Sequence, residues 1–277
     1  MRPAWIVPDW PAPAGVRAAS TLRTGGVSPP PWASLNLGDH VGDDPVRVAA
    51  NRRGLIETLA LPDEPAWLQQ VHGTEVLRLD EPALAGERIA DAAVTARPGR
   101  VLAVMTADCL PVLFCGVANG GAMVGAAHAG WRGLAAGVLE ATVAEMAVAT
   151  DASPGELIAW IGPAIGREAY EVGEEVRAAC LGAGEGTADG RAGCEADSKA
   201  GGDPAAAAYF TAGRPGHWHC DLAGLARHRL ERLGLAGVYG GEWCTHADPA
   251  RFFSHRRDGA DGPTGRMATL IWLAPSG

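Results

Sequence analysis

The chain has 277 residues, of which 47% are hydrophobic and 20% are charged, so it is long enough and apolar enough to bury a core. Its formal net charge of -9 excludes a general attraction for nucleic acid or an anionic membrane, and a phosphate would need a local basic patch. Pro8, Asp9 and Pro11 interrupt the first residues, and no apolar run reaches the ~18–20 residues that span a bilayer. We expect a cytoplasmic protein whose partners include neither nucleic acid nor membrane.

The first half of the chain predicts short strands and one long helix. Residues 17–24 have the pattern of a strand, and Asp44-Pro45 begins a helix that continues to Leu59. Residues 67–72 predict a strand that stops at Gly73 and resumes at 76–79. Further short apolar segments predict strands at 91–95, 101–105, 110–115 and 122–127.

The second half mixes helices with strands. Apolar residues at helical spacing after Gly133 predict one helix of about four turns. Residues 182–216, rich in Gly, Ala, Asp and Pro, predict a mobile surface loop. The remaining predicted elements are a strand at 157–161, helices at 171–181 and 221–233, and strands at 238–244 and 268–273. The pattern predicts a single α/β or α+β domain over residues 1–277, with more than one layer covering the sheet.

The six cysteines do not form a disulfide pattern, because none belongs to a Cys-x-x-Cys pair and the chain is long. They are Cys109, Cys115, Cys180, Cys194, Cys220 and Cys244. We expect most of them to be buried small hydrophobic residues.

Three segments place a soft or imidazole ligand beside a glycine or proline turn. They centre on His72, Cys109 and His128, and each follows an apolar segment predicted as a strand. Strand ends of one sheet can converge on a single mouth, and one thiolate with two imidazoles is a good zinc set that leaves the fourth tetrahedral position open. The alternative is two histidines bonded to the backbone and one buried thiol, and the long spacings alone do not decide between them.

The motifs that surround these residues, taken in order, resemble the laccase-domain or polyphenol oxidase family, which includes bacterial YfiH and YlmD proteins. The matching segments are Ser20–Gly26, Ser34–Gly38, His40–Pro45, Gln70–Gly73, Thr106–Pro111, His128–Gly133, Ile161–Gly166, Phe253–Asp258 and Gly265-Arg266. Two features depart from the family pattern: His255 stands where a tyrosine is familiar, and the 182–216 segment looks longer than usual.

The resemblance implies a single-domain, four-layer α/β/β/α sandwich with mixed sheets. It also implies that His72, Cys109 and His128 are the metal ligands and catalytic centre of a zinc enzyme. The implied activity is phosphorolysis of adenosine, inosine, guanosine and methylthioadenosine, with deamination of adenosine. The small-molecule partners are therefore a purine nucleoside and phosphate, while the preferred nucleoside, the general acid and the oligomeric state stay open.

Part of this chemistry can be assigned to further residues. Arg23, Arg132 and Arg256 are candidates for binding phosphate, with a surface ion pair as the alternative for each. Asn36 is a candidate substrate contact or, as we favour slightly, the residue that holds a turn. Asp91 and Asp108 are candidates to orient a ligand histidine, although Asp108 would point away if Cys109 points into the site.

Three other functions remain open. A copper polyphenol oxidase needs more histidine pairs than eight histidines with one His-x-His provide, although copper can replace zinc at an N/S site. A metal-free hydrolase would use Cys109 as nucleophile and a histidine as base, on an amide such as a cell-wall peptide precursor; the family fold resembles a toxin deamidase of that type. A non-enzymatic zinc-binding module is the third.

Overall fold

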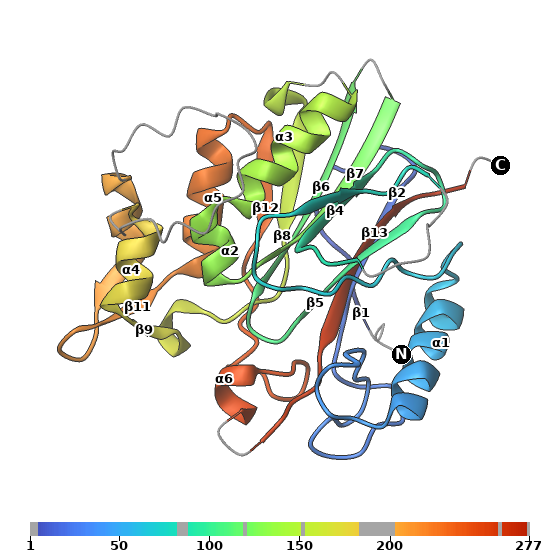
Figure 1. The fold of residues 1–277 in the computed structure, drawn as a ribbon, viewed down its shortest axis with the longest axis horizontal. Coiled ribbons are helices and arrows are strands. Elements are labelled where there is room, and N and C mark those ends of the chain that lie inside the picture. The colour runs from blue at the N-terminus through green and yellow to red at the C-terminus, as the bar shows by residue number, and fades with distance from the viewer. Residues whose placement is uncertain are drawn as a thin grey trace.

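The computed structural model shows a mixed α/β protein, which confirms the predicted fold class (Figure 1). It describes residues 5–81, 88–118, 121–150, 153–182, 203–259 and 262–275. In Figure 1 α1 lies on one side of the strands and helices α2, α3, α4 and α5 lie on the other. The extension of one domain over the whole chain stays a prediction.

The larger sheet has six strands in the order β12-β8-β6-β7-β4-β3 and mixes parallel with antiparallel pairs. Its long central hairpin, β6 and β7, follows from two apolar segments that lie close together in sequence. The strands are β3 (Val76–Arg78), β4 (Ala92–Thr95), β6 (Leu110–Ala118), β7 (Gly121–Ala129), β8 (Leu157–Ile161) and β12 (Gly237–Gly240).

A second sheet has the order β1-β2-β13-β5 and brings the two ends of the chain together, since β13 lies between β2 and β5. A small third sheet has the order β10-β11-β9. These strands are β1 (Trp5–Ile6), β2 (Val16–Thr21), β5 (Val101–Thr106), β9 (Glu171–Gly173), β10 (Phe210–Ala212), β11 (His217–Cys220) and β13 (Met267–Leu273).

Helix α1 (Pro45–Leu59) begins as predicted, because the Asp44 side chain accepts a hydrogen bond from Val46 N and Pro45 occupies the first turn. Helix α5 (Leu222–Arg232) is likewise capped by Asp221. The other helices are α2 (Trp131–Ala136), α3 (Val138–Thr150), α4 (Glu174–Cys180) and α6 (His255–Asp258), with 3-10 turns at Pro154–Glu156, Arg167–Ala169 and Pro204–Tyr209.

The core fills the space on both faces of the strands, which explains their continuous apolar sequences. In β5, Val101 and Ala103 pack in a cluster with Leu55 of α1, whereas Leu102 and Val104 pack in a cluster between the two larger sheets. In β6 the same alternation separates side chains facing the helices from side chains facing the other sheet. A strand with both faces covered is apolar at every position.

Four predicted elements are wrong in part. Residues 67–72 form no strand and contribute one isolated bridge, at Gln69, with another just before them at Ala66. The Gln70 side chain, rather than backbone, bonds both Met105 N and Met105 O. The helix predicted after Gly133 is two helices, α2 and α3, separated at Gly137, which has a φ of 101°. The helix predicted at 171–181 begins at Glu174, after strand β9, and the strand predicted at 238–244 ends at Gly240.

The predicted loop at 182–216 is wrong for its second part. Residues 203–212 form a 3-10 turn and strand β10, and Ala206 and Phe210 are buried in the core. Residues 183–202 lie outside the described residues. Pattern recognition failed here because alanine is too weakly apolar to reveal a buried face.

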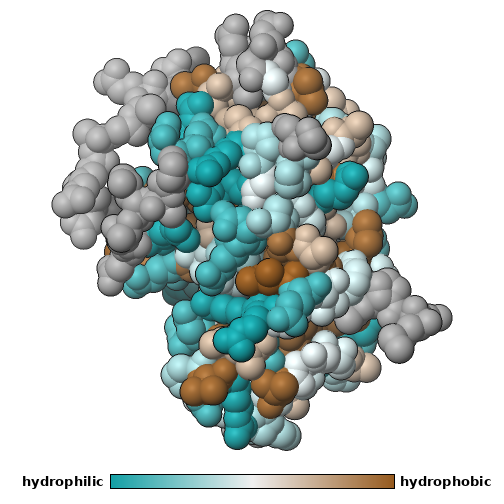
Figure 2. Space-filling view, turned by 90° about the vertical axis from the view of Figure 1, so that its right-hand side faces the viewer, coloured by the Kyte–Doolittle hydropathy of each residue, from teal (hydrophilic) through white to brown (hydrophobic). Residues whose placement is uncertain are grey.

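Large hydrophobic side chains reach the surface at dispersed positions. In Figure 2 hydrophilic residues cover much of the face, and hydrophobic residues form small separate groups. Within the described residues, none of the helices has the length and apolar character needed to cross a membrane. The five cysteines in that part of the chain are all free thiols, as predicted, and three of them are buried.

Candidate active site

The three predicted metal ligands come from three separate segments that meet at one end of the larger sheets. His128 is the penultimate residue of β7, and Cys109 occupies the turn between β5 and β6. His72 does not follow a strand as expected; it lies in a bend before β3 and adopts a φ of 62°. The left-handed conformation is uncommon for a non-glycine residue and is found preferentially at functional sites.

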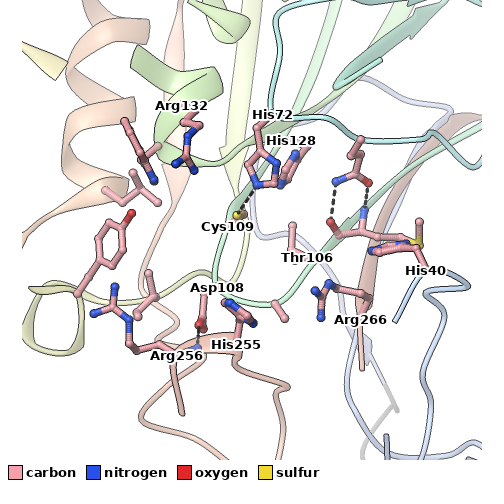
Figure 3. A pocket seen from close by; sticks show the side chains of 17 residues that line it. His40, His72, Thr106, Asp108, Cys109, His128, Arg132, His255, Arg256 and Arg266 are labelled. Carbon is pink, nitrogen blue, oxygen red and sulfur yellow. Dashed lines mark hydrogen bonds between the residues drawn. The ribbon is translucent and has the colours of Figure 1, made fainter. Parts of the chain in front are cut away.

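Their ligand atoms face one another (Figure 3). The Cys109 Sγ lies 3.7 Å from His72 Nε2, and one ligand atom from each of the three residues lies within 4.8 Å of the others. The two imidazole rings are 4.7 Å apart at an interplanar angle of 73°. Such a His/Cys/His group has the composition and proximity to bind a metal ion.

Asp91 holds two of the three segments in place. Its fully buried carboxylate lies 2.8 Å from His128 Nδ1, which leaves Nε2 for the ligand side. The same carboxylate accepts hydrogen bonds from the backbone N–H groups of Val71, His72 and Gly73 at 2.6–3.1 Å. Asp91 therefore has the contact predicted for it, which orients a predicted ligand histidine, and it also stabilises the strained bend.

The site favours charged forms of its ligands. Burial alone would raise the pKa of the Cys109 thiol, but His128 and His72 lower it to about 6. Burial opposes the charge on His128, but the Cys109 thiolate and Asp91 raise its pKa to about 9. A thiolate and an imidazolium therefore face each other near neutral pH in the metal-free protein. A cation that replaces the His128 proton would retain the attraction to the thiolate.

Gly130 keeps the ligand atoms close to the backbone. A Cβ at this position would lie 2.6 Å from His72 Cδ2 and 3.0 Å from Cys109 Sγ. Those contacts are too short, so a side chain would displace a ligand. Gly130 is thus required because His72 and Cys109 approach its backbone closely, and not because of its backbone angle.

A cavity of about 510 Å³ opens beside the three ligands. Three arginines line it: Arg132 of α2, Arg256 of α6, and Arg266, which precedes β13. None of the three has an ion pair with a carboxylate among the residues that the structure describes. Arg132 lies over the Trp131 ring at 4.3 Å, and Arg256 Nη1 donates to the Glu171 carbonyl. The cavity therefore presents unneutralised cations beside the ligands.

Two candidate substrate residues are not among those that line the cavity. Arg23 donates to the carbonyls of Ala33 and Pro249. Asn36 is fully buried and bonds both the N–H and the carbonyl of Gly38, so it does hold a turn. The geometry gives both residues a role in holding the chain around the cavity, and a direct contact with substrate stays a prediction for them.

Asp108 does not orient a ligand histidine. Its carboxylate accepts hydrogen bonds from Thr245 Oγ1, Ser254 Oγ and the backbone N–H of Arg256. It therefore fixes the start of α6, which carries His255 and Arg256, against the turn that carries Cys109. The sequence argument that Asp108 points away from the ligands agrees with these contacts.

Sequence reasoning missed several residues of the cavity. Arg266 was recognised only as part of a motif, and Gln70, Trp131 and Tyr170 were given no role, yet all four line the cavity. Arg266 could have been recognised from its position directly before the apolar, buried strand β13, because a charged residue is not expected in the core there. His40, the first residue of the His40–Pro45 motif, lines it as well.

Comparisons with known proteins agree with this geometry. Residues 17–274 match the family model described as multi-copper polyphenol oxidoreductase laccase. The chain belongs to this family. It is 48% identical to the Escherichia coli purine nucleoside phosphorylase YfiH over 268 residues, which cover 97% of this chain and 98% of that protein. A purine nucleoside phosphorylase of Xylella fastidiosa is 51% identical over 282 residues, with 98% of each chain covered.

The laccase-domain family membership extends to three-dimensional structure. The crystal structure of YlmD from Geobacillus stearothermophilus matches with a TM-score of 0.82 and 32% identity, covering 99% of this chain and 98% of that one. The predicted resemblance to YfiH and YlmD proteins is therefore confirmed. Relatives named as enzymes match almost the whole chain, and this supports an enzymatic function for the protein.

Proposed function

We propose that this protein is a cytoplasmic, zinc-dependent purine nucleoside enzyme. Its reactions are phosphorolysis of adenosine, inosine, guanosine and methylthioadenosine, and deamination of adenosine. The observation that carries the proposal is the placement of His72, Cys109 and His128 at the edge of a cavity lined by three arginines that have no carboxylate partner among the described residues. The relatives named purine nucleoside phosphorylase support it.

Zinc fits the donor set better than copper does. One thiolate and two imidazoles provide three ligands, and the cavity provides room for an open fourth position. A multicopper oxidase needs several copper sites, whereas the part of the chain that the structure describes holds a single His/Cys/Asp/Glu group suited to a metal. Copper in place of zinc is the alternative that the family description suggests.

The residues of the site have separate roles in the proposed reactions. Bound zinc supplies a Lewis acid and lowers the pKa of a water molecule to about 7. Asp91 keeps His128 in the tautomer that presents Nε2, and Arg132 and Arg256 bind anionic oxygens. In phosphorolysis an oxygen of phosphate forms a bond to C1′ of the ribose, the bond from C1′ to the base nitrogen breaks, and the base leaves with a proton.

The test combines metal analysis with turnover. The protein is purified without added metal, bound metals are measured, and adenosine is assayed with phosphate for wild type, Cys109→Ala and Cys115→Ala. Cys115 is a matched control, because it is a buried thiol between the sheets whose pKa burial raises to about 12. Stoichiometric zinc, with base or inosine formed by wild type and Cys115→Ala only, supports the proposal.

Other outcomes favour the alternatives. Activity that survives chelation but not thiol alkylation would overturn the zinc enzyme in favour of the Cys/His hydrolase. A protein that unfolds on chelation and turns over none of the four nucleosides would indicate a zinc-binding module. Stoichiometric copper with oxidation of phenols would indicate the polyphenol oxidase.

A further inference from the structure

Arg266 differs from the other two arginines of the cavity in how firmly it is held. Its backbone N–H donates to Asn36 Oδ1 at 2.9 Å, and its Nη1 donates to the carbonyls of Thr264 and Gly265. Arg132 and Arg256 are exposed, whereas Arg266 is partly buried. A guanidinium fixed on one side and less hydrated loses little freedom and little water when it binds an anion.

The Ser34–Gly38 motif contacts Arg266 and positions it. Asn36 is fully buried, and its side chain bonds Gly38 N, Gly38 O and Asp43 Oδ2 besides Arg266 N. Gly38 leaves space for the arginine stem, because a Cβ there would lie 2.8 Å from Arg266 Cγ and 3.1 Å from its Cβ. A motif distant in sequence thus sets the position of Arg266.

The guanidinium keeps donors for a ligand. Both side-chain hydrogen bonds of Arg266 come from Nη1, so Nε and Nη2 have no protein acceptor among the described residues. Arg266 lines the same cavity as Cys109 and Asp108. Burial lowers the pKa of Arg266, and the charges of Cys109 and Asp108 oppose that shift. In Figure 3 its guanidinium points into the cavity below the three ligands.

We propose that Arg266 is the principal phosphate-binding residue of the cavity and that Asn36 and Gly38 position it. This inference rests on the proposed function for the identity of the anion. Two adjacent N–H donors of a guanidinium match two oxygens of a phosphate. The phosphate comes either from inorganic phosphate, the co-substrate of phosphorolysis, or from a phosphate ester on a nucleotide.

The test uses zinc-loaded protein and four variants. Arg266→Met removes the charge but keeps the stem, Arg266→Lys keeps the charge but not the fork, and Gly38→Ala displaces the stem without changing a charge. Arg53→Met is the control for the loss of one positive charge, because Arg53 is exposed on α1 outside the cavity. Zinc content and thermal unfolding are measured first, so that a variant that fails to fold is recognised and Gly38→Ala or Arg266→Lys replaces it.

Binding of inorganic phosphate and of adenosine 5′-monophosphate is then measured by calorimetry, and the KM for phosphate is measured by turnover. We expect Arg266→Met to weaken phosphate about 10- to 100-fold, the range for a charge-assisted bidentate contact, and to raise the KM for phosphate more than that for nucleoside. Gly38→Ala and Arg266→Lys should give smaller losses in the same direction. Arg53→Met should match wild type.

The outcomes separate this inference from the proposed function. Phosphate binding that depends on Arg266 in a protein without nucleoside turnover would support the phosphate site and reject the function. Loss of nucleotide binding alone in Arg266→Met would support the site and assign its anion to an ester. Unchanged phosphate binding in folded, zinc-loaded Arg266→Met, or wild-type protein that binds neither probe, would overturn the inference.

Discussion

Two buried aspartates near the cavity have different roles: Asp108 lines the cavity, whereas Asp91 contacts His128, which lines it. Asp91 bonds an imidazole of the ligand group as well as three backbone N–H groups, whereas Asp108 bonds two hydroxyls and one backbone N–H. Asp91 therefore acts on the charge of the predicted metal ligands. Asp108 holds the start of α6 and bonds none of the predicted ligands.

The difference shows why acidic residues in a pocket are not all reactive groups. Both carboxylates stabilise backbone that has no regular hydrogen bonding of its own: the bend at His72, with a φ of 62°, and the turn at Asp108 itself, with a φ of 87°. Left-handed residues persist when surrounding contacts determine them. Substitutions on the two sides should therefore separate metal binding from substrate binding.

The largest expected effect on the His/Cys/His group comes from a steric clash. In Gly130→Ala the new Cβ would meet His72 Cδ2 and Cys109 Sγ, so one ligand must move. We expect zinc affinity to fall by more than the 10- to 100-fold typical of changes around a metal site, that is, by more than about 100-fold. Equilibrium competition with a chromogenic chelator measures it.

The matched control is Gly54→Ala, since Gly54 is inside α1 and a Cβ there meets nothing within 4 Å. That variant should bind zinc normally and gain about 0.5–1 kcal/mol of unfolding free energy from helix propensity. Normal zinc affinity in Gly130→Ala would show that the ligand group is not packed against this glycine.

Matched amide substitutions test the difference between Asp91 and Asp108. In Asp91→Asn an amide replaces one oxygen that now accepts N–H donors, and His128 loses its charged partner. Zinc affinity should fall about 10- to 100-fold, as for other outer partners of metal ligands. Asp108→Asn should bind zinc like wild type. Equal losses in both variants, measured by the same chelator competition, would remove the distinction between the two aspartates.

The elements that could be predicted are those with strong local patterns. Helix α1 was recognised from its aspartate cap and proline, and β5, β6 and β7 from continuous apolar runs that follow from burial on both faces. The break at Gly137 and the absence of a strand at 67–72 could not be predicted. The missing strand depends on a tertiary partner, the Gln70 side chain that bonds Met105, whereas the break depends on the left-handed conformation of Gly137, which apolar periodicity does not reveal.

For the site, residue chemistry predicted the His/Cys/His group but not its surroundings. A thiol and two imidazoles beside glycine or proline turns are visible in sequence, whereas the contacts of Asn36 with Arg266, and of Asp108 with Arg256, join residues far apart in the chain. No periodicity records such contacts. The arginines that line the cavity are separated from those that hold loops, such as Arg23, only by the fold.

The ionisation of Cys109 is expected to give a smaller effect, on the pH dependence of its alkylation. In metal-free protein, burial raises the pKa of the Cys109 thiol, but His128 and His72 lower it to about 6. The rate of alkylation by iodoacetamide should therefore rise through about pH 6 and level off above it. Because this pKa lies below that of an ordinary thiol, about 8.5, the thiolate contributes stability that is lost as pH falls through about 6.

Mass spectrometry of modified Cys109 over pH 4–10 measures the profile, and the buried Cys115, whose pKa is raised to about 12, serves as the internal reference. A midpoint near that of an ordinary thiol, about 8.5, would mean that the imidazoles do not face the sulfur as described.

The smallest expected effect belongs to the Asp108 side. In Asp108→Asn, one of the oxygens that bond Thr245, Ser254 and Arg256 N becomes an amide donor, so the start of α6 shifts and Arg256 moves with it. Because Arg256 is proposed to bind substrate oxygens rather than the metal, KM should rise about tenfold, the value of one ordinary hydrogen bond, with a smaller change in kcat. Steady-state kinetics with nucleoside and phosphate varied separately measures both constants. A merely destabilised variant would lower kcat in proportion to the unfolded fraction and leave KM unchanged, and that result would reduce Asp108 to a structural residue.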